Sequence, residues 1–213
     1  MSLDGANTNT VQWQSLTIRK KTRAEQKQQV PLCIWLTGLS GAGKSTLGNA
    51  LETRLHVEGR HTYLLDGDNM RHGICSNLGF SDTDRRENVR RVAEVAKLMV
   101  DAGLIVIVAI ISPDQVCRTF ARDLFAKGEF FEIFVDAELD ICERRDPKGL
   151  YGRARRGEIS NFTGITSRYE RPTNAQLRVD AGKLSVDACV EQIYSVITGS
   201  QCTLLTSTKE LSC

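Results

Sequence analysis

Residues 38–46, with the sequence GLSGAGKST, combine three glycines with a lysine and a serine in a fixed order. Gly38, Gly43, Lys44 and Ser45 match the pattern G-x-x-x-x-G-K-[ST], which chance produces in about one chain in a hundred of this length. The glycines let the backbone wrap around an anion, and a helix that begins there adds its positive end. Lys44 would then contact the β- and γ-phosphates of a nucleotide, and the Ser45 hydroxyl would bind Mg²⁺. We therefore predict a phosphate loop made of Gly38, Leu39, Ser40, Gly41, Ala42, Gly43, Lys44, Ser45 and Thr46, although the loop alone fixes neither the nucleotide nor the reaction.

Other uses of a glycine-rich segment fit this sequence less well. In the dinucleotide fingerprint G-x-G-x-x-G, a last glycine belongs where Thr46 stands. A flexible linker would not lie directly between an apolar run and a helix-like segment. A regulatory GTPase needs an N-K-x-D motif, which the sequence lacks. The D-x-x-G match at residues 146–149 follows a helix-like segment rather than a strand, so we interpret it as chance.

Two carboxylates, Asp66 and Asp68, follow the next apolar run along the chain, at 62–66. At the carboxyl end of a parallel strand, such a pair can hold Mg²⁺ through water or accept a proton from an attacking hydroxyl. An ordinary Asp-Gly-Asp-Asn turn accounts for the same letters, but it does not explain the charge beside Arg71.

Guanidinium groups and one serine complete the set of chemically capable residues. The segment DRRENVRR (84–91) suits an anionic acceptor through bidentate contacts, although some of its arginines must lie on a solvated helix face. Ser112 ends a third apolar run, where it could contact substrate, be phosphorylated or cap the next helix, and capping is at least as well supported by the spacing.

Continuous apolar runs alternate with helix-like segments, as expected for strands covered on both faces. We predict strands at 32–37, 62–66, 104–111 and 130–136, and helices after the phosphate loop up to Gly59, over 87–102, over 139–145 and over 186–197. This alternation predicts an α/β three-layer domain with a mostly parallel sheet.

The chain divides into a polar N-terminal arm at 1–29, a domain at 30–199 and a C-terminal tail at 200–213 that we expect to be flexible. The arm is read as solvated chain or a short helix rather than a docking element. Residues 146–172 are rich in glycine and arginine and show no strand pattern, which is typical of a functional lid.

Net charge, cysteine content and the N-terminal sequence bear on where the protein is found and what it binds. The 213 residues carry a net charge of +2, which gives no support for nucleic-acid or membrane binding. Seven scattered cysteines without a C-x-x-C pair indicate reduced thiols, and the polar N-terminus does not read as a secretory signal. We therefore expect a cytoplasmic protein without a membrane span.

Several segments, in their order, resemble the adenylylsulfate kinases (APS kinases), which are P-loop kinases. They are WLTGLSGAGKST, LDGDNMRHG, LGFSDTDRRENVRR, ISP, DPKGLY, NFTGI and YE-x-P, and the resemblance spans roughly residues 9–197. It implies that ATP, with Mg²⁺ as cofactor, phosphorylates the 3′-hydroxyl of adenosine 5′-phosphosulfate (APS) in sulfate assimilation, giving PAPS and ADP. It also implies a homodimer, and it leaves open an association with ATP sulfurylase.

The same resemblance implies roles for individual residues. Asp68 would engage the 3′-hydroxyl, Lys148 would meet phosphate charge, and Phe80 and Phe162 would sandwich the substrate adenine. Core packing is the alternative for both rings, and we expect loop positions instead. The implied catalytic set is Lys44, Asp66, Asp68, Ser112 and Lys148, and the implied acceptor set is Asp68, Asn69, Arg71, Phe80, Arg85, Asn88, Ile111, Ser112, Lys148, Phe162 and Thr163.

The sequence also departs from the family pattern. Asp114 and Gln115 stand where an aromatic residue and an arginine are usual, whereas Arg118 keeps a second arginine. Thr166 and Arg168 replace an aspartate and a proline. These changes bear on acceptor affinity, lid closure or oligomer contacts. Two alternatives remain: another small-molecule P-loop kinase, and an ATP-binding regulatory subunit that has lost catalysis.

Overall fold

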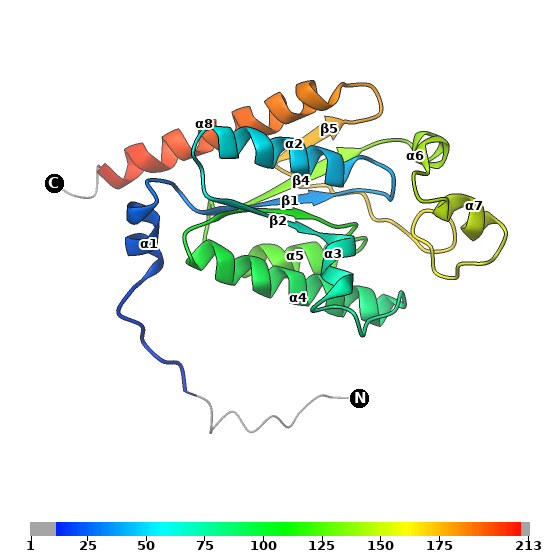
Figure 1. Ribbon diagram of the computed structural model, residues 1–213, viewed down its shortest axis with the longest axis horizontal. Helices are drawn as coiled ribbons and strands as arrows, with labels where there is room; N and C mark the ends of the chain where they lie inside the picture. Colours follow the sequence, from blue (N-terminus) through cyan, green and yellow to red (C-terminus); the bar gives the residue numbers. More distant parts are fainter. Residues whose placement is uncertain (1–11, 210–213) are drawn as a thin grey trace.

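A parallel five-stranded sheet lies between two layers of helices in the computed structural model, which describes residues 12–209 (Figure 1). The strands are β1 (Leu32–Thr37), β2 (Thr62–Asp66), β3 (Ile105–Ala109), β4 (Phe130–Asp136) and β5 (Leu177–Asp180). Their order in the sheet is β2-β3-β1-β4-β5, and every ladder is parallel. The predicted fold class and the four predicted strands are confirmed.

The fifth strand, β5, was not predicted. It pairs with β4 in the register Ile133↔Leu177 to Asp136↔Asp180 and forms one edge of the sheet. Its four residues, LRVD, alternate apolar with charged side chains, so the strand lacks the continuous apolar run that marks the others, and only Val179 is buried. The loop that follows β5 reaches the cleft described below.

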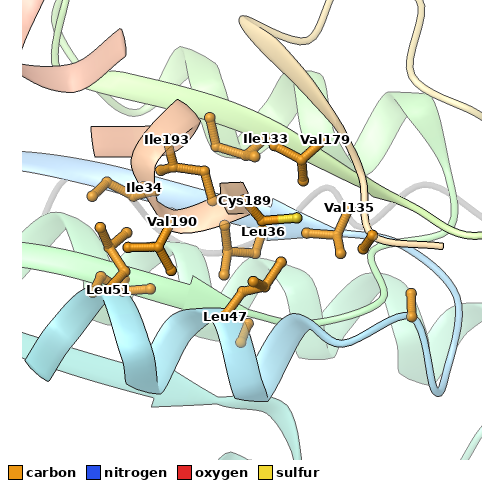
Figure 2. Close-up of a cluster of buried hydrophobic side chains, with 14 of the residues drawn as sticks. Ile34, Leu36, Leu47, Leu51, Ile133, Val135, Val179, Cys189, Val190 and Ile193 are labelled. Atoms are coloured by element: carbon orange, nitrogen blue, oxygen red, sulfur yellow. The ribbon is translucent and has the colours of Figure 1, made fainter. Parts of the chain in front are cut away.

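Successive residues of β1 point to opposite faces of the sheet and build two separate cores. Ile34 and Leu36 pack toward α2 (Lys44–Val57) and α8 (Val186–Lys209), as Figure 2 shows. Trp35 packs on the other side, toward α4 (Asp82–Asp101) and α5 (Gln115–Asp123). With both faces buried, β1 holds the segment that follows it at a fixed place.

The remaining four helices of the described chain have only six or seven residues each. They are α1 (Lys20–Gln26), α3 (Gly67–His72), α6 (Leu139–Arg145) and α7 (Leu150–Arg155). Figure 1 shows α6 and α7 beyond the carboxyl ends of the central strands. Helix α1 lies within the predicted N-terminal arm. The ion pairs Lys20–Glu129 and Arg23–Asp101 join it to the domain.

The chain ends differ in part from expectation. Helix α8 begins where predicted but continues beyond residue 197, so residues 200–209 of the expected tail are helical. Residues 1–11 of the predicted arm and 210–213 of the predicted tail lie outside the described residues. None of the helices within residues 12–209 has the length and apolar character needed to cross a membrane.

Candidate active site

The phosphate loop joins β1 to α2 and is packed tightly against the chain around it. A Cβ atom at Gly38 would lie 2.4 Å from the carbonyl oxygen of Val135, and one at Gly41 would lie 2.9 Å from that of Cys142. Gly41 also adopts a φ of +73°, which side chains rarely tolerate. These glycines are therefore required by space and by conformation.

Lys44, the first residue of α2, is buried within this loop. Its Nζ donates hydrogen bonds to the carbonyl oxygens of Gly38, at 3.0 Å, and Leu39, at 2.7 Å. Burial is the main cause that lowers the pKa of Lys44 to about 8. Burial thus destabilises the charged form of Lys44, and a bound anion would stabilise it.

Ser45 and Asp66 meet at the open side of the loop. The Ser45 hydroxyl donates to an Asp66 carboxylate oxygen at 2.6 Å. The other Asp66 oxygen accepts the backbone N–H of Asp68 at 3.0 Å and caps α3. Residues 66–69 therefore form the capped start of helix α3 rather than an isolated turn, and the cap places the Asp66 carboxylate beside Ser45.

These two side chains fit Mg²⁺ by their donor chemistry, since both are hard oxygen donors. Within residues 12–209 no group of three or more acidic, histidine or cysteine residues could hold a metal ion by itself. Mg²⁺ bound with a nucleotide needs only one or two protein oxygens, because phosphates and waters supply the rest. The pair of Ser45 and Asp66 meets that requirement.

Asp68 and Lys148 form an ion pair, although 80 positions separate them in the chain. Asp68 lies on α3, and Lys148 lies in the turn before α7, where Asp146 accepts the N–H groups of Leu150 and Gly152. The D-x-x-G match at 146–149 is therefore a helix cap rather than a nucleotide switch. The ion pair brings one acid and one base together at the mouth of the site.

Two arginines with neutral partners form the far end of the cleft. Arg85 is 8% exposed and donates to the Phe80 and Asn161 carbonyl oxygens and to the Thr163 hydroxyl. Arg71 donates to carbonyl oxygens at residues 78 and 79. Neither forms a salt bridge within the described part of the chain, and burial lowers the pKa of both. Cations held this way favour an anionic ligand.

An unpaired acceptor lies beside them. Asn88 is 7% exposed, and its Oδ1 has no hydrogen-bond partner among the residues that the structure describes. A buried amide oxygen without a donor is costly, so a ligand that donates a hydrogen bond would be stabilised there.

The two predicted aromatic residues occupy different environments. Phe80 is 54% exposed and lies under the Arg71 guanidinium, 4.4 Å from the ring centre. Phe162 lies in a loop, as expected, but it is also buried in the core, in a T-shaped contact with Tyr151 whose ring centres are 4.9 Å apart. Both rings nevertheless line the same cleft.

Ser112 is 2% exposed, and its hydroxyl faces partners in the core. It accepts from Trp35 Nε1 at 3.1 Å and donates to the Thr37 hydroxyl at 2.9 Å. Ser112 also adopts a φ of +41°, and Arg118 Nη1 donates to its carbonyl oxygen at 2.7 Å. It does not cap α5, because the cap position belongs to Asp114, so the helix-capping interpretation is wrong.

The other arginines of the segment at 84–91 form ion pairs with acidic residues. Arg90 and Arg91 both bond Glu87, whose pKa they lower to about 2. Arg86 lies 3.4 Å from Asp114, one of the residues that depart from the family pattern. The prediction that some of these arginines lie on a solvated face is confirmed.

The remaining departures have structural partners. The backbone N–H of Gln115 donates to the Glu170 carboxylate at 2.8 Å, and the Gln115 side-chain oxygen accepts a hydrogen bond from Arg118 at 2.9 Å. The Thr166 hydroxyl accepts the backbone N–H of Phe162 at 2.8 Å, which fixes the turn that carries this ring. For Arg168 the structure gives no explanation.

A cleft of about 570 Å³ brings most of these groups together. It is lined by Ser40–Thr46, Asp66, Asp68, Arg71, Phe80, Arg85, Asn88, Ile111, Ser112, Lys148, Phe162 and Thr163 from the predicted sets. Gly38, Leu39 and Asn69 do not line it.

Sequence reasoning missed one wall of this cleft. Arg145 donates to the carbonyl oxygens of Ala42 and Ala181, and thereby joins the phosphate loop to the loop after β5. Leu184 and Val186 complete this wall. The glycine that follows the sequence LRVDA was the available signal, since it marks the carboxyl end of a strand.

Comparison with known proteins supports a single family. The family model described as adenylylsulphate kinase matches residues 30–180. The adenylyl-sulfate kinase of Vibrio vulnificus (strain YJ016) is 56% identical over 188 residues, which cover 88% of this chain and 91% of that protein. The bifunctional enzyme NodQ of Rhizobium meliloti is 57% identical over 80% of this chain, which spans 27% of that protein.

A solved structure agrees with the sequence matches. The Mycobacterium tuberculosis APS kinase CysC, in complex with AMPPNP and APS, superposes with a TM-score of 0.76 at 47% identity, over 78% of this chain and 97% of that one. Family model, relatives and structure all lead to the same conclusion: this chain belongs to the adenylylsulphate kinase family.

Proposed function

We propose that this chain transfers the γ-phosphoryl group of ATP to the 3′-hydroxyl of APS, producing PAPS and ADP. One observation carries the proposal: the cleft that holds the phosphate loop also holds the partly buried Arg71 and the buried Arg85, and neither cation has a carboxylate partner in the described chain. APS is an anion with an adenine ring, and the same region offers Phe80 and Phe162 to that ring.

ATP would occupy the opposite part of the cleft. The phosphate loop and Lys44 would hold its phosphates, and the wall of Arg145, Leu184 and Val186 would receive its adenine. Leu184 is 38% exposed and Val186 is 39% exposed, so both offer apolar surface to a flat base. ATP bound in this way would point its γ-phosphate toward Asp68 and Lys148.

The chemistry would take place where Asp68 and Lys148 meet. Asp68 would accept the hydrogen bond, and then the proton, of the attacking hydroxyl, while Lys148 would turn to the charge on the transferring group. When bound by Ser45 and Asp66, Mg²⁺ would neutralise charge on the β- and γ-phosphates. Ser112 would position the end of β3 through its buried hydroxyl, and direct transfer needs no phosphorylated serine.

The lid segment, defined as residues 146–172, would exclude water from this reaction. It carries Lys148 and Phe162, so its position decides whether both ends of the cleft are complete. Its C-terminal end is fixed, because Glu170 bonds Pro113, Gln115 and Arg118 through its backbone and side chain.

A panel of acceptors tests the function. Purified protein with ATP and Mg²⁺ is expected to form ADP with APS, and to form none above background with AMP, gluconate or shikimate. A coupled ADP assay measures this, and mass spectrometry of the product checks that phosphate is on the 3′ position. Equal turnover over the panel would indicate another small-molecule kinase. Nucleotide binding without turnover on APS would indicate a regulatory subunit.

ATP and ADP affinity should fall as pH rises through about 8. The pKa of Lys44 is lowered to about 8 in the free protein. Below that pH Lys44 is charged and attracts phosphate. Above it, Lys44 must take up a proton before the nucleotide binds, which weakens binding. The dissociation constant of ADP, measured by calorimetry, should rise about fivefold between about pH 8 and pH 9. Lys44→Arg, which stays charged, should remove this dependence. A flat native profile would contradict the assigned role of the lowered pKa.

Assembly and location remain predictions. We propose a homodimer in the cytoplasm, as the family resemblance implies. Association with ATP sulfurylase is also proposed, since the bifunctional NodQ shows that a chain of this kind occurs within a longer protein. Sedimentation velocity would test the dimer.

A further inference from the structure

Tyr151 lies between the two ends of the cleft without lining it. It is on α7, within the lid segment, and is 2% exposed. We infer that Tyr151 is a positioning residue that couples the phosphate loop to the aromatic acceptor end, so that nucleotide and acceptor strengthen each other's binding. The inference rests on the proposed function, because it takes these two ends to hold ATP and APS.

The hydroxyl of Tyr151 contacts the phosphate loop directly. It donates to the carbonyl oxygen of Ser40 at 2.9 Å, across 111 positions of the chain. The Ser40 carbonyl and the Gly41 N–H belong to one planar peptide unit, so a bond that fixes one also fixes the direction of the other. Tyr151 therefore orients a peptide of the loop that must surround the nucleotide phosphates.

The ring of Tyr151 contacts the acceptor end. It meets Phe162 edge to face, with ring centres 4.9 Å apart and planes at 80°. The next residue, Thr163, accepts a hydrogen bond from Arg85 at 2.8 Å. Arg85 in turn donates to the Phe80 carbonyl oxygen at 3.0 Å. Contacts thus run without a gap from the phosphate loop to both aromatic residues.

A buried tyrosine has few accessible rotamers and transmits a constraint from one partner to the other. Nucleotide that orders the Ser40 peptide would hold Tyr151 in place, and Tyr151 would then hold Phe162 ready for the acceptor base. Thermodynamic linkage makes the effect reciprocal, so the acceptor must improve nucleotide affinity by the same factor. The hydroxyl is separable from the packing, because phenylalanine keeps the ring against Phe162.

The experiment compares the affinity of AMPPNP with Mg²⁺, by calorimetry, in the absence and presence of saturating APS. The native protein is expected to bind AMPPNP more tightly with APS, and Tyr151→Phe should reduce this ratio about fivefold, the effect of one neutral hydrogen bond. The matched control is Tyr194→Phe on α8, whose hydroxyl bonds Glu58 at 2.8 Å and which does not line the cleft. It should keep the native ratio.

Several other results would overturn the inference. A ratio of one in the native protein, or an unchanged ratio in Tyr151→Phe, would overturn the coupling. A lower melting temperature of Tyr151→Phe with an unchanged ratio would reduce the residue to a structural role and overturn it as well. Failure of the native protein to bind APS at all would overturn the proposed function, and with it this inference.

Discussion

Lys44→Ala is expected to reduce the turnover number about a thousandfold or more, the largest loss from any single change in this chain. Lys44 is the cation whose Nζ lies at the Gly38 and Leu39 carbonyl oxygens, where the β- and γ-phosphates would replace them as partners. Charge that develops on the transferring group would then have no fixed cation on the donor side. Steady-state kinetics with ATP and APS, at saturating concentrations of both, measures the effect.

Two controls separate chemistry from folding. Removing the lysine leaves two loop carbonyl oxygens without a donor, so Lys44→Met, which keeps an apolar stem, should lose turnover to the same extent. Lys97→Ala removes an exposed lysine of α4 and should leave turnover unchanged. Near-native turnover in Lys44→Ala with an unchanged melting temperature would remove the phosphate loop from the mechanism.

The phosphate loop and the central sheet were predictable because their signals are local. β1 is a buried run of six residues, and the glycines after it are required by space that neighbouring carbonyl oxygens occupy. β5 could not be found in the same way, because its four residues, LRVD, alternate apolar with charged side chains and form no apolar run. The wall at Leu184 and Val186 was missed with it.

Contacts between residues far apart in the chain could not be predicted from the sequence. Arg85 and Arg86 are neighbours in one segment, yet the helix turns the first into the cleft and the second toward Asp114. The burial of the Ser112 hydroxyl depends on Trp35 and Thr37 of β1, which lie more than 70 positions away. Local patterns carry no information about such pairings. The catalytic and binding roles themselves remain predictions.

Asp68→Asn is expected to lower the turnover number about a hundredfold or more while the affinity for APS changes only about threefold. Asp68 is 61% exposed at its side chain and is held by Lys148, so it already lies beside a cation at the point where the two ends of the cleft meet. Asparagine keeps the shape and the hydrogen-bond acceptor, but it cannot take a proton from the attacking hydroxyl. The loss should therefore appear in the chemical step rather than in binding.

Single-turnover kinetics, together with calorimetric titration of APS, separates these two quantities. Asp123→Asn is the matched control, because it neutralises an exposed carboxylate at the end of α5 and should change neither. Loss of APS affinity with a near-native turnover number would make Asp68 a binding contact only. The proton would then have to leave through another group, and Asp66, which is 2.6 Å from the Ser45 hydroxyl, is the other cleft carboxylate on the same turn.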